Sequence, residues 1–120
     1  MKILIADDSR VMRQIVTRTL RQAGFGGNDL VEAADGQEAY DTIKSEKPDL
    51  VLSDWNMPHM TGVEVLRAIR RDGIETPFGF ITSEGTEQMR EIAASAGALF
   101  LIVKPFTADH FRDALEPILG

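Results

Sequence analysis

The feature that most constrains the fold is a regular alternation of short apolar runs with amphipathic helical patterns. Apolar runs of a length suited to buried strands recur five times, and each is followed by apolar residues at helical spacing. Five strand-helix units of this kind predict a mostly parallel sheet with helices on both faces, joined by right-handed crossovers. The predicted strands cover residues 2–6, 30–34, 49–53, 78–81 and 98–103.

The helices predicted between these strands have recognisable ends. Glycine after the last apolar residue ends a helix, proline disfavours helix in the residue before it, and threonine is a good N-terminal cap. No repeat or linker interrupts the pattern, so a single three-layer α/β domain is expected. The helices are predicted at residues 10–23, 37–46 and 63–71, then between Thr86 and Gly97, and finally after Thr107.

Length and charge narrow the class of protein. The 120 residues have the size of one domain, 1–120, with no output domain. A formal net charge of −6 argues against nucleic-acid binding, which needs clustered lysine and arginine. No apolar run approaches a membrane span, and two aspartates interrupt any secretory segment at the start of the chain. Cysteine is absent, which excludes disulfides and thiolate metal sites and is compatible with the expected cytoplasmic location.

Polar residues follow four of the predicted strands at the point where each strand ends. In open α/β sheets the carboxyl ends of the strands form the edge at which ligands bind. Each residue also has an ordinary structural explanation as a helix cap, a strand end or a solvated charge. Their convergence on one edge favours a functional site made of Asp7 and Asp8, Asp54, Thr82 and Ser83, and Lys104.

The three aspartates of this set predict a metal ion. Carboxylates brought close together repel one another unless a cation lies among them. Oxygen ligands without histidine or cysteine favour a hard ion, and a few carboxylates with room for water suit Mg²⁺ better than Ca²⁺. An ion held by Asp8 and Asp54, with Asp7 acting directly or through water, would bridge the Asp54 carboxylate and an incoming phosphoryl group. Lys104 would add a second positive charge, as phosphoryl transfer requires.

The ordered set of motifs resembles the receiver domains of two-component response regulators, in particular the stand-alone chemotaxis regulators. The resemblance spans the whole chain and implies a flavodoxin-like (βα)5 sandwich with strand order 2-1-3-4-5, an order that the strand-helix pattern alone leaves open. The motifs that carry the resemblance are Asp7-Asp8, Asp54-Trp55-Asn56-Met57-Pro58 with Gly62, Thr82-Ser83, and Lys104-Pro105-Phe106.

The resemblance also implies roles for these residues. Asp54 would be phosphorylated by a sensor histidine kinase, and Asp8, Asp54 and the backbone carbonyl of Asn56 would bind Mg²⁺ with help from Asp7. Thr82 would be the switch hydroxyl, and Lys104 would contact the phosphoryl group and precede a cis peptide bond to Pro105. Such a protein is a switch rather than an enzyme, with at most slow self-dephosphorylation. Its other expected partners are a downstream target, with the flagellar motor switch as one candidate, and a phosphatase.

The chain departs from the family pattern at one position. Receiver domains usually couple the threonine to an aromatic side chain three residues before the lysine, and here that position holds Leu101. Phe100 precedes it, but alternation along the strand should turn its ring to the opposite face of the sheet. Gly79, inside the fourth predicted strand, costs strand stability and predicts a close approach of a neighbouring group.

Other functions remain open at this point. A phosphatase of the haloacid-dehalogenase type also uses an aspartate nucleophile and Mg²⁺, but it should carry a second acid at the position of Asn56. A flavodoxin-like binding module should have a hydroxyl-rich phosphate loop after the first strand, where this chain has two aspartates. Within the receiver class, a phosphate sink that serves another regulator is a further alternative.

Several conspicuous residues are interpreted as structural. Trp55 is expected to be a surface-facing or half-buried neighbour of Asp54. His59 and His110 lack partners at metal-ligand spacing and are expected to be loop and surface residues. The glycine-rich stretch 24–27 follows a helix and so is in the wrong place to begin a nucleotide-binding helix.

The resemblance also implies a face for binding partners. It is formed by the fourth helix, the fifth strand and the fifth helix, with Met89, Ile92 and Leu101 as candidate contacts.

Overall fold

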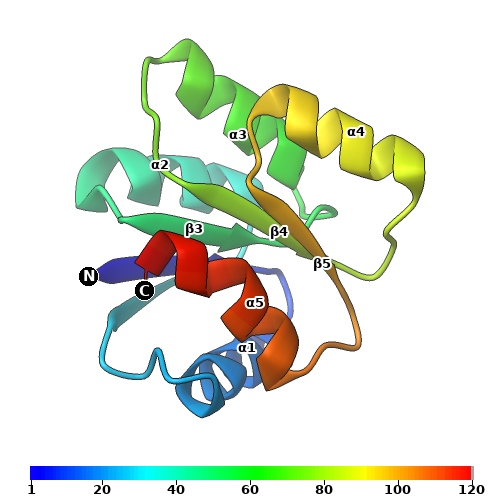
Figure 1. The fold of residues 1–120 in the computed structure, drawn as a ribbon. Coiled ribbons are helices and arrows are strands. Elements are labelled where there is room, and N and C mark those ends of the chain that lie inside the picture. The colour runs from blue at the N-terminus through cyan, green and yellow to red at the C-terminus, as the bar shows by residue number, and fades with distance from the viewer. Residues whose placement is uncertain (120) are drawn as a thin grey trace.

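The computed structural model describes residues 1–119, in which strands and helices alternate five times (Figure 1). The number and order of the elements agree with the prediction. The strands are β1 (Lys2–Ala6), β2 (Asp29–Ala33), β3 (Leu50–Ser53), β4 (Phe78–Thr82) and β5 (Phe100–Val103), and the helices are α1 (Arg10–Gln22), α2 (Gly36–Glu46), α3 (Gly62–Arg71), α4 (Glu87–Ala96) and α5 (Ala108–Leu119).

The strands form one parallel sheet in the order β2-β1-β3-β4-β5, which confirms the expected 2-1-3-4-5 arrangement. β1 lies between β2 and β3, with Ile3 in register with Leu30 on one side and Leu50 on the other. The strand order therefore reverses at β1. Because ligands bind where this reversal opens a crevice, the carboxyl ends of β1 and β3 are the expected position of a site.

Helices cover the sheet on both faces and create two cores (Figure 1). On one face α1 and α5 bury Leu20 and Phe111 against Ile5 and Leu52. On the other face α2, α3 and α4 pack over Leu4, Val51 and their neighbours. Successive strand residues point to opposite faces, so a strand that is apolar throughout is buried on both sides. This explains why the strands read as continuous apolar runs.

Hydrogen bonds at the helix ends account for small differences from the predicted boundaries. Thr61 and Glu64 form a reciprocal capping box, which starts α3 at Gly62 rather than at residue 63. Asp35 accepts a hydrogen bond from the Glu38 amide and starts α2 one residue early. At the end of α4 the Ala98 amide donates to the Ala93 carbonyl, so residues 98 and 99 belong to the helix-ending turn and β5 begins later than predicted. β2 is shifted by one residue and β4 extends to Thr82.

Gly79 allows an aromatic ring to lie directly against β4. A Cβ atom built at Gly79 would lie 2.1 Å from Cζ of Phe100, the residue with which it is in register on β5. Phe100 belongs to the core under α1 and α5, whereas Leu101 packs with the core under α2, α3 and α4. Two predictions are therefore confirmed: a neighbouring group lies close to Gly79 on β4, and Phe100 and Leu101 on β5 point to opposite faces of the sheet.

Gly79→Ala should lower the free energy of unfolding by about 1–3 kcal/mol, the usual cost of overpacking a tight core. The new methyl would displace the Phe100 ring, so the same substitution should cost less when residue 100 is leucine. Urea unfolding of the two single variants and the double variant gives the coupling as a double-mutant cycle. Equal costs in both backgrounds would show that the ring is not the limiting contact.

Both ends of the described chain lie at the edge of the sheet where the strands begin (Figure 1). Met1 precedes β1, and α5 runs back from the carboxyl edge toward that same side. No helix formed by residues 1–119 combines the length and apolar character needed to cross a membrane.

Candidate functional site

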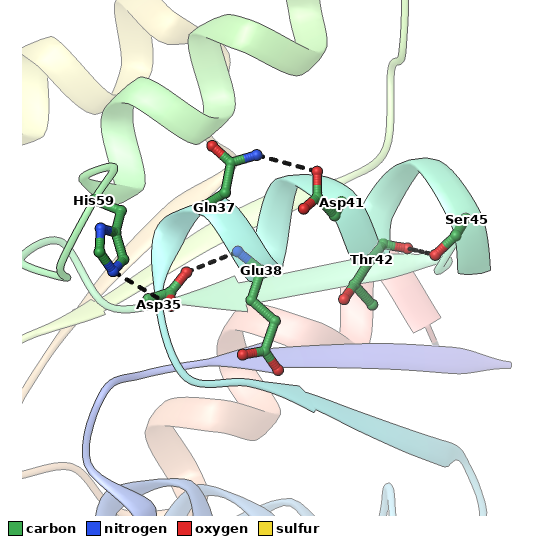
Figure 2. Close-up of a pocket in the computed structure, with 7 residues that line it drawn as sticks. All are labelled: Asp35, Gln37, Glu38, Asp41, Thr42, Ser45 and His59. Atoms are coloured by element: carbon green, nitrogen blue, oxygen red, sulfur yellow. Dashed lines mark hydrogen bonds and ion pairs between the residues drawn. The ribbon is translucent and has the colours of Figure 1, made fainter.

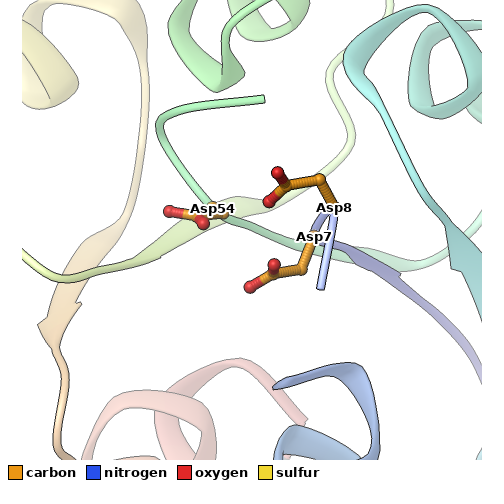
Figure 3. Close-up of side chains that lie close together, drawn as sticks. All are labelled: Asp7, Asp8 and Asp54. Atoms are coloured by element: carbon orange, nitrogen blue, oxygen red, sulfur yellow. The ribbon is translucent and has the colours of Figure 1, made fainter. Parts of the chain in front are cut away.

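Three carboxylates meet at the carboxyl edge of the sheet, as predicted (Figure 3). Asp7 and Asp8 follow β1, and Asp54 follows β3. One carboxylate oxygen from each of the three lies within 4.8 Å of the others. Asp7 is buried, Asp54 is half-buried and Asp8 is exposed, so the cluster opens to solvent on the Asp8 side. The arrangement follows from topology, because β1 and β3 are neighbouring parallel strands that end at the same level.

The Lys104 ammonium group lies between two of these carboxylates. Its Nζ is 3.2 Å from Oδ2 of Asp7 and 3.3 Å from Oδ2 of Asp54. Only 16% of the Lys104 side chain is exposed, so the ion pairs are shielded from water and are stronger than surface pairs. The peptide bond between Lys104 and Pro105 is cis, in agreement with the expectation. Lysine thus supplies one positive charge to a site with three negative ones.

The environment of Asp54 raises the pKa of its carboxyl group. Burial is the main cause, because it penalises the charged form, and the neighbouring Asp7 carboxylate acts in the same direction. Lys104 and the backbone N–H of Trp55, which donates to Oδ1 at 2.7 Å, oppose the rise without cancelling it. The protein alone therefore leaves the charge on Asp54 incompletely compensated, and an additional cation at this edge would favour the ionised form.

Asp54→Asn should increase the free energy of unfolding at neutral pH in the absence of metal. A carboxyl whose pKa is raised in the folded state holds its proton more tightly there than in the unfolded chain. Its contribution to stability is present at acid pH and is lost as the pH rises through the folded-state pKa. The advantage of asparagine should therefore be largest at neutral pH, about 1 kcal/mol or less, and should vanish on acidification. Urea unfolding at both pH values tests this, with the exposed Asp41→Asn as control.

Thr82 and Lys104 are neighbours across the last strand pair. Thr82 ends β4 fully buried, in register with Val103, and its carbonyl accepts a hydrogen bond of 2.8 Å from the Lys104 amide. The Thr82 hydroxyl accepts from the Glu84 amide at 3.4 Å, a long and weak bond. Ser83 is exposed. In the described part of the chain, the buried Thr82 hydroxyl thus has one weak side-chain hydrogen bond and lies on the strand beside the one that precedes Asp54.

The loop after Asp54 is held by close backbone packing. The Gly62 amide donates to the Trp55 carbonyl at 2.8 Å, and a Cβ atom at Gly62 would lie 2.3 Å from the Asp54 carbonyl oxygen. Glycine is therefore required for the loop to close against Asp54. Trp55 is half-buried, the second of the two expected placements, with its ring centroid 4.9 Å from that of Phe80. Asn56 is exposed in this loop.

The side chains at this edge suit a hard divalent cation. The three aspartates supply oxygen ligands only, one of them is exposed to water, and no sulfur or imidazole is part of the cluster. Burial and the Asp7 carboxylate raise the pKa of Asp54, so added positive charge nearby would favour its ionised form.

One contact to this cluster was not predicted from the sequence. Arg13 on α1 donates from Nη1 to the Asp7 carbonyl at 2.7 Å and from Nε to Oε1 of Glu32 at 2.8 Å. A signal for it exists, because the first turns of α1 carry Arg10 and Arg13 and the first turn carries no acidic residue. Positive charge is unfavourable near the positive end of a helix dipole, so an arginine there points to a specific partner.

A second concave region lies along α2 and contains none of the predicted site residues. It is a shallow groove of about 520 Å³ lined by seven side chains, with His59 facing Asp35 across its end at 4.0 Å (Figure 2). His110 instead closes the first turn of α5, where its amide donates to the Thr107 hydroxyl at 3.3 Å. Both histidines lie outside the acidic cluster, as predicted. The residues that line the groove are Asp35, Gln37, Glu38, Asp41, Thr42, Ser45 and His59.

Comparison with known proteins gives one consistent result. Residues 3–116 match the family model of the response regulator receiver domain. Over its whole length the chain is 38% identical to a chemotaxis protein CheY homolog of Campylobacter jejuni, of which the match covers 93%. It is 41% identical to chemotaxis protein CheY of Pseudomonas aeruginosa, with 98% of this chain and 95% of that protein covered.

Solved structures agree with the sequence matches. Chemotaxis protein CheY4 of Vibrio cholerae superposes with a TM-score of 0.85 at 35% identity, over 98% of both chains. A receiver domain of the Francisella response regulator 1452 superposes with a TM-score of 0.87 at 26% identity, over 98% of this chain and 94% of that one. The fold, the matched residues and the relatives lead to one conclusion: the chain belongs to the response regulator receiver domain family and is of the CheY type.

Proposed function

We propose that the chain is a phospho-acceptor switch in which Asp54 receives a phosphoryl group from a sensor histidine kinase and the modification changes the binding of a partner. The observation that carries the proposal is the Asp54 carboxylate itself. It lies at an open edge of the sheet with two further carboxylates within 4.8 Å and the Lys104 ammonium group at 3.3 Å. Negative oxygens gathered around one positive charge suit the binding of a metal and a phosphoryl group together.

Mg²⁺ is the proposed cofactor, and it would supply positive charge that neutralises the phosphoryl oxygens. Asp8 and Asp54 would hold it together with the backbone carbonyl of Asn56, while Asp7 would assist. Asp54 would act as the nucleophile, so that a bond forms between its carboxylate oxygen and phosphorus while the bond from phosphorus to the donor breaks. Lys104 would bind a phosphoryl oxygen, and the Thr82 hydroxyl would bind another.

The same residues argue against rapid turnover. Hydrolysis of an acyl phosphate needs a base that activates water, and the residue two positions after Asp54 is the amide Asn56. An enzyme of the haloacid-dehalogenase type would need an acid there. The proposed protein is therefore a switch that keeps its phosphoryl group long enough for a partner to read it, with slow self-dephosphorylation as its only catalytic activity.

The relatives suggest the biological setting. Because they are chemotaxis proteins, we propose a chemotaxis-type phosphorelay in the cytoplasm. A histidine kinase would be the phosphoryl donor, and the flagellar motor switch is the candidate target. A phosphatase that shortens the signal is a further proposed partner. A role as a phosphate sink for another regulator would use the same acceptor chemistry without a target of its own.

Incubation with acetyl phosphate and Mg²⁺ tests the acceptor chemistry directly. Mass spectrometry of the intact protein should show the addition of one phosphoryl group, and chelation of the metal with EDTA should prevent it. A protein whose mass stays unchanged with Mg²⁺ would refute the proposal. Steady release of inorganic phosphate over many turnovers, without a phosphorylated protein, would instead support the phosphatase alternative.

A further inference from the structure

The side chain of Arg13 joins three parts of the fold behind the acidic cluster. It extends from α1, donates from Nη1 to the backbone carbonyl of Asp7 at 2.7 Å, and donates from Nε to Glu32 on β2 at 2.8 Å. Only 14% of the Arg13 side chain is exposed, whereas 52% of the Glu32 side chain is exposed. A guanidinium group carries several donors in a fixed planar arrangement, so it can hold two acceptors at once.

Asp7 is held at each of its polar atoms. Its amide donates to the Ala33 carbonyl at 3.1 Å, and its carbonyl accepts from Arg13. Its Oδ1 accepts from the Ser9 amide at 2.9 Å and its Oδ2 from Lys104 at 3.2 Å. The Asp7 carbonyl belongs to the peptide unit that links Asp7 to Asp8, and a peptide unit is planar and rigid. The hydrogen bond from Arg13 to this oxygen therefore fixes the orientation of the Asp7–Asp8 peptide.

We propose that Arg13, supported by Glu32, is a positioning residue for the divalent-cation site and acts by orienting the Asp7–Asp8 peptide. Asp8 is exposed, so the place of its carboxylate depends on the backbone that carries it. Arg13 would act through its two hydrogen-bond partners, the backbone carbonyl of Asp7 and the side chain of Glu32, rather than as a ligand itself. The inference rests on the proposed function, because it concerns the site that Mg²⁺ would occupy.

A role in orientation and a role through charge predict opposite effects on cation binding when Arg13 is removed. If Arg13 acted only through its positive charge, its removal would strengthen cation binding, since one repulsive charge would be gone. If it acts by orientation, its removal should weaken binding, as the loss of groups that orient metal ligands usually does, by about 10-fold to 100-fold. The ion pair with Glu32 offers a way to separate the two, because changing both residues to neutral ones leaves the net charge unchanged.

The decisive variant is Arg13→Met combined with Glu32→Gln. Its matched control is Lys2→Met combined with Glu46→Gln, which removes an ion pair of 3.1 Å at the amino end of the sheet, far from the cluster. Mg²⁺ affinity is measured by calorimetry and by the emission of Trp55. NMR spectra of the backbone amides, recorded in EDTA, show whether the Asp8 amide changes its environment when no metal is present. Arg13→Lys keeps the charge but replaces the planar donor group with a single ammonium.

The Arg13/Glu32 variant should bind Mg²⁺ about tenfold more weakly than the wild type, the control should bind like the wild type, and Arg13→Lys should lie between them. The Asp8 amide signal should move in the Arg13/Glu32 variant and stay in place in the control. Unchanged or tighter binding in the variant would overturn the proposal, as would an equal loss in the control. If the wild type itself bound no Mg²⁺, the proposed function would fail. The positioning role has its own test, because it would be overturned if the Asp8 amide signal in EDTA were the same in the Arg13/Glu32 variant as in the wild type. If the double variant does not fold, Arg13→Lys decides by the same criteria.

Discussion

Asp54→Asn is expected to abolish the gain of one phosphoryl group from acetyl phosphate and Mg²⁺. An amide oxygen is a far weaker nucleophile than a carboxylate oxygen and cannot form the acyl phosphate. The substitution also removes a charged group from the proposed metal site, so Mg²⁺ should bind more weakly. Asparagine has nearly the shape of aspartate and can still accept the Trp55 N–H bond, so the fold around Asp54 should be retained. Intact-protein mass spectrometry is the direct measurement.

The control for this experiment is an aspartate outside the cluster. Asp41 on α2 is exposed and hydrogen-bonded only to Gln37 in the described part of the chain, so Asp41→Asn should be phosphorylated like the wild type. If Asp54→Asn still gained a phosphoryl group, another side chain would be the acceptor. Peptide mapping after reduction with borohydride, which converts an acyl phosphate to an alcohol, would then identify that residue.

Lys104→Met should lower the free energy of unfolding by about 1–3 kcal/mol in the absence of metal, because its ion pairs with Asp7 and Asp54 are partly buried. Removing one partner of a buried ion pair leaves its counterpart without compensation, and here two carboxylates lose the same partner. Methionine keeps much of the length and apolar stem of lysine, so the loss reports mainly on charge. Burial and the Asp7 carboxylate already raise the pKa of Asp54, so protonation of Asp54 relieves the repulsion and the difference from the wild type should shrink as the pH falls.

Added Mg²⁺ should restore part of the stability lost in Lys104→Met. A ligand that binds only the folded state stabilises it in proportion to its occupancy, and a site that has lost a competing ammonium group should bind the ion more tightly. Urea unfolding with EDTA and with Mg²⁺ gives both values. Lys2→Met is the comparison, because it breaks the more exposed pair with Glu46 and should cost only about 0–1 kcal/mol. A loss equally small for Lys104→Met would mean that its ion pairs contribute little.

The parts of the fold that were predicted correctly are those that depend on the residue pattern within one segment of the chain. Apolar runs and helical spacing located ten elements, and the polar residues at strand ends located the acidic cluster, because parallel strands end at one edge. Boundaries were missed by a residue or so where a side chain adds a bond, as when Thr61 and Glu64 extend α3. The strand order was implied by the family resemblance, because the sequence of a strand does not determine which strands will lie beside it.

The parts that escaped prediction depend on contacts between distant segments. Glycine at position 79 signalled a close approach, and only the structure shows that the Phe100 ring lies there. No role for Arg13 was predicted from the sequence, because its two acceptors become its partners only when α1, β1 and β2 are assembled. The burial that chiefly raises the pKa of Asp54 also depends on the assembled fold, whereas the closeness of Asp7 was predicted from the strand ends.

The chain begins and α5 finishes at the side of the sheet where the strands start, while the aspartates lie at the side where they finish (Figures 1 and 3). An affinity handle, a fluorophore or a sensor surface attached at either end of this chain would thus leave the acidic cluster, with the proposed acceptor Asp54, open to solution on its Asp8 side. Immobilised molecules should exchange metal and phosphodonor as freely as molecules in bulk, which makes tethered single-molecule recordings of the switch practicable.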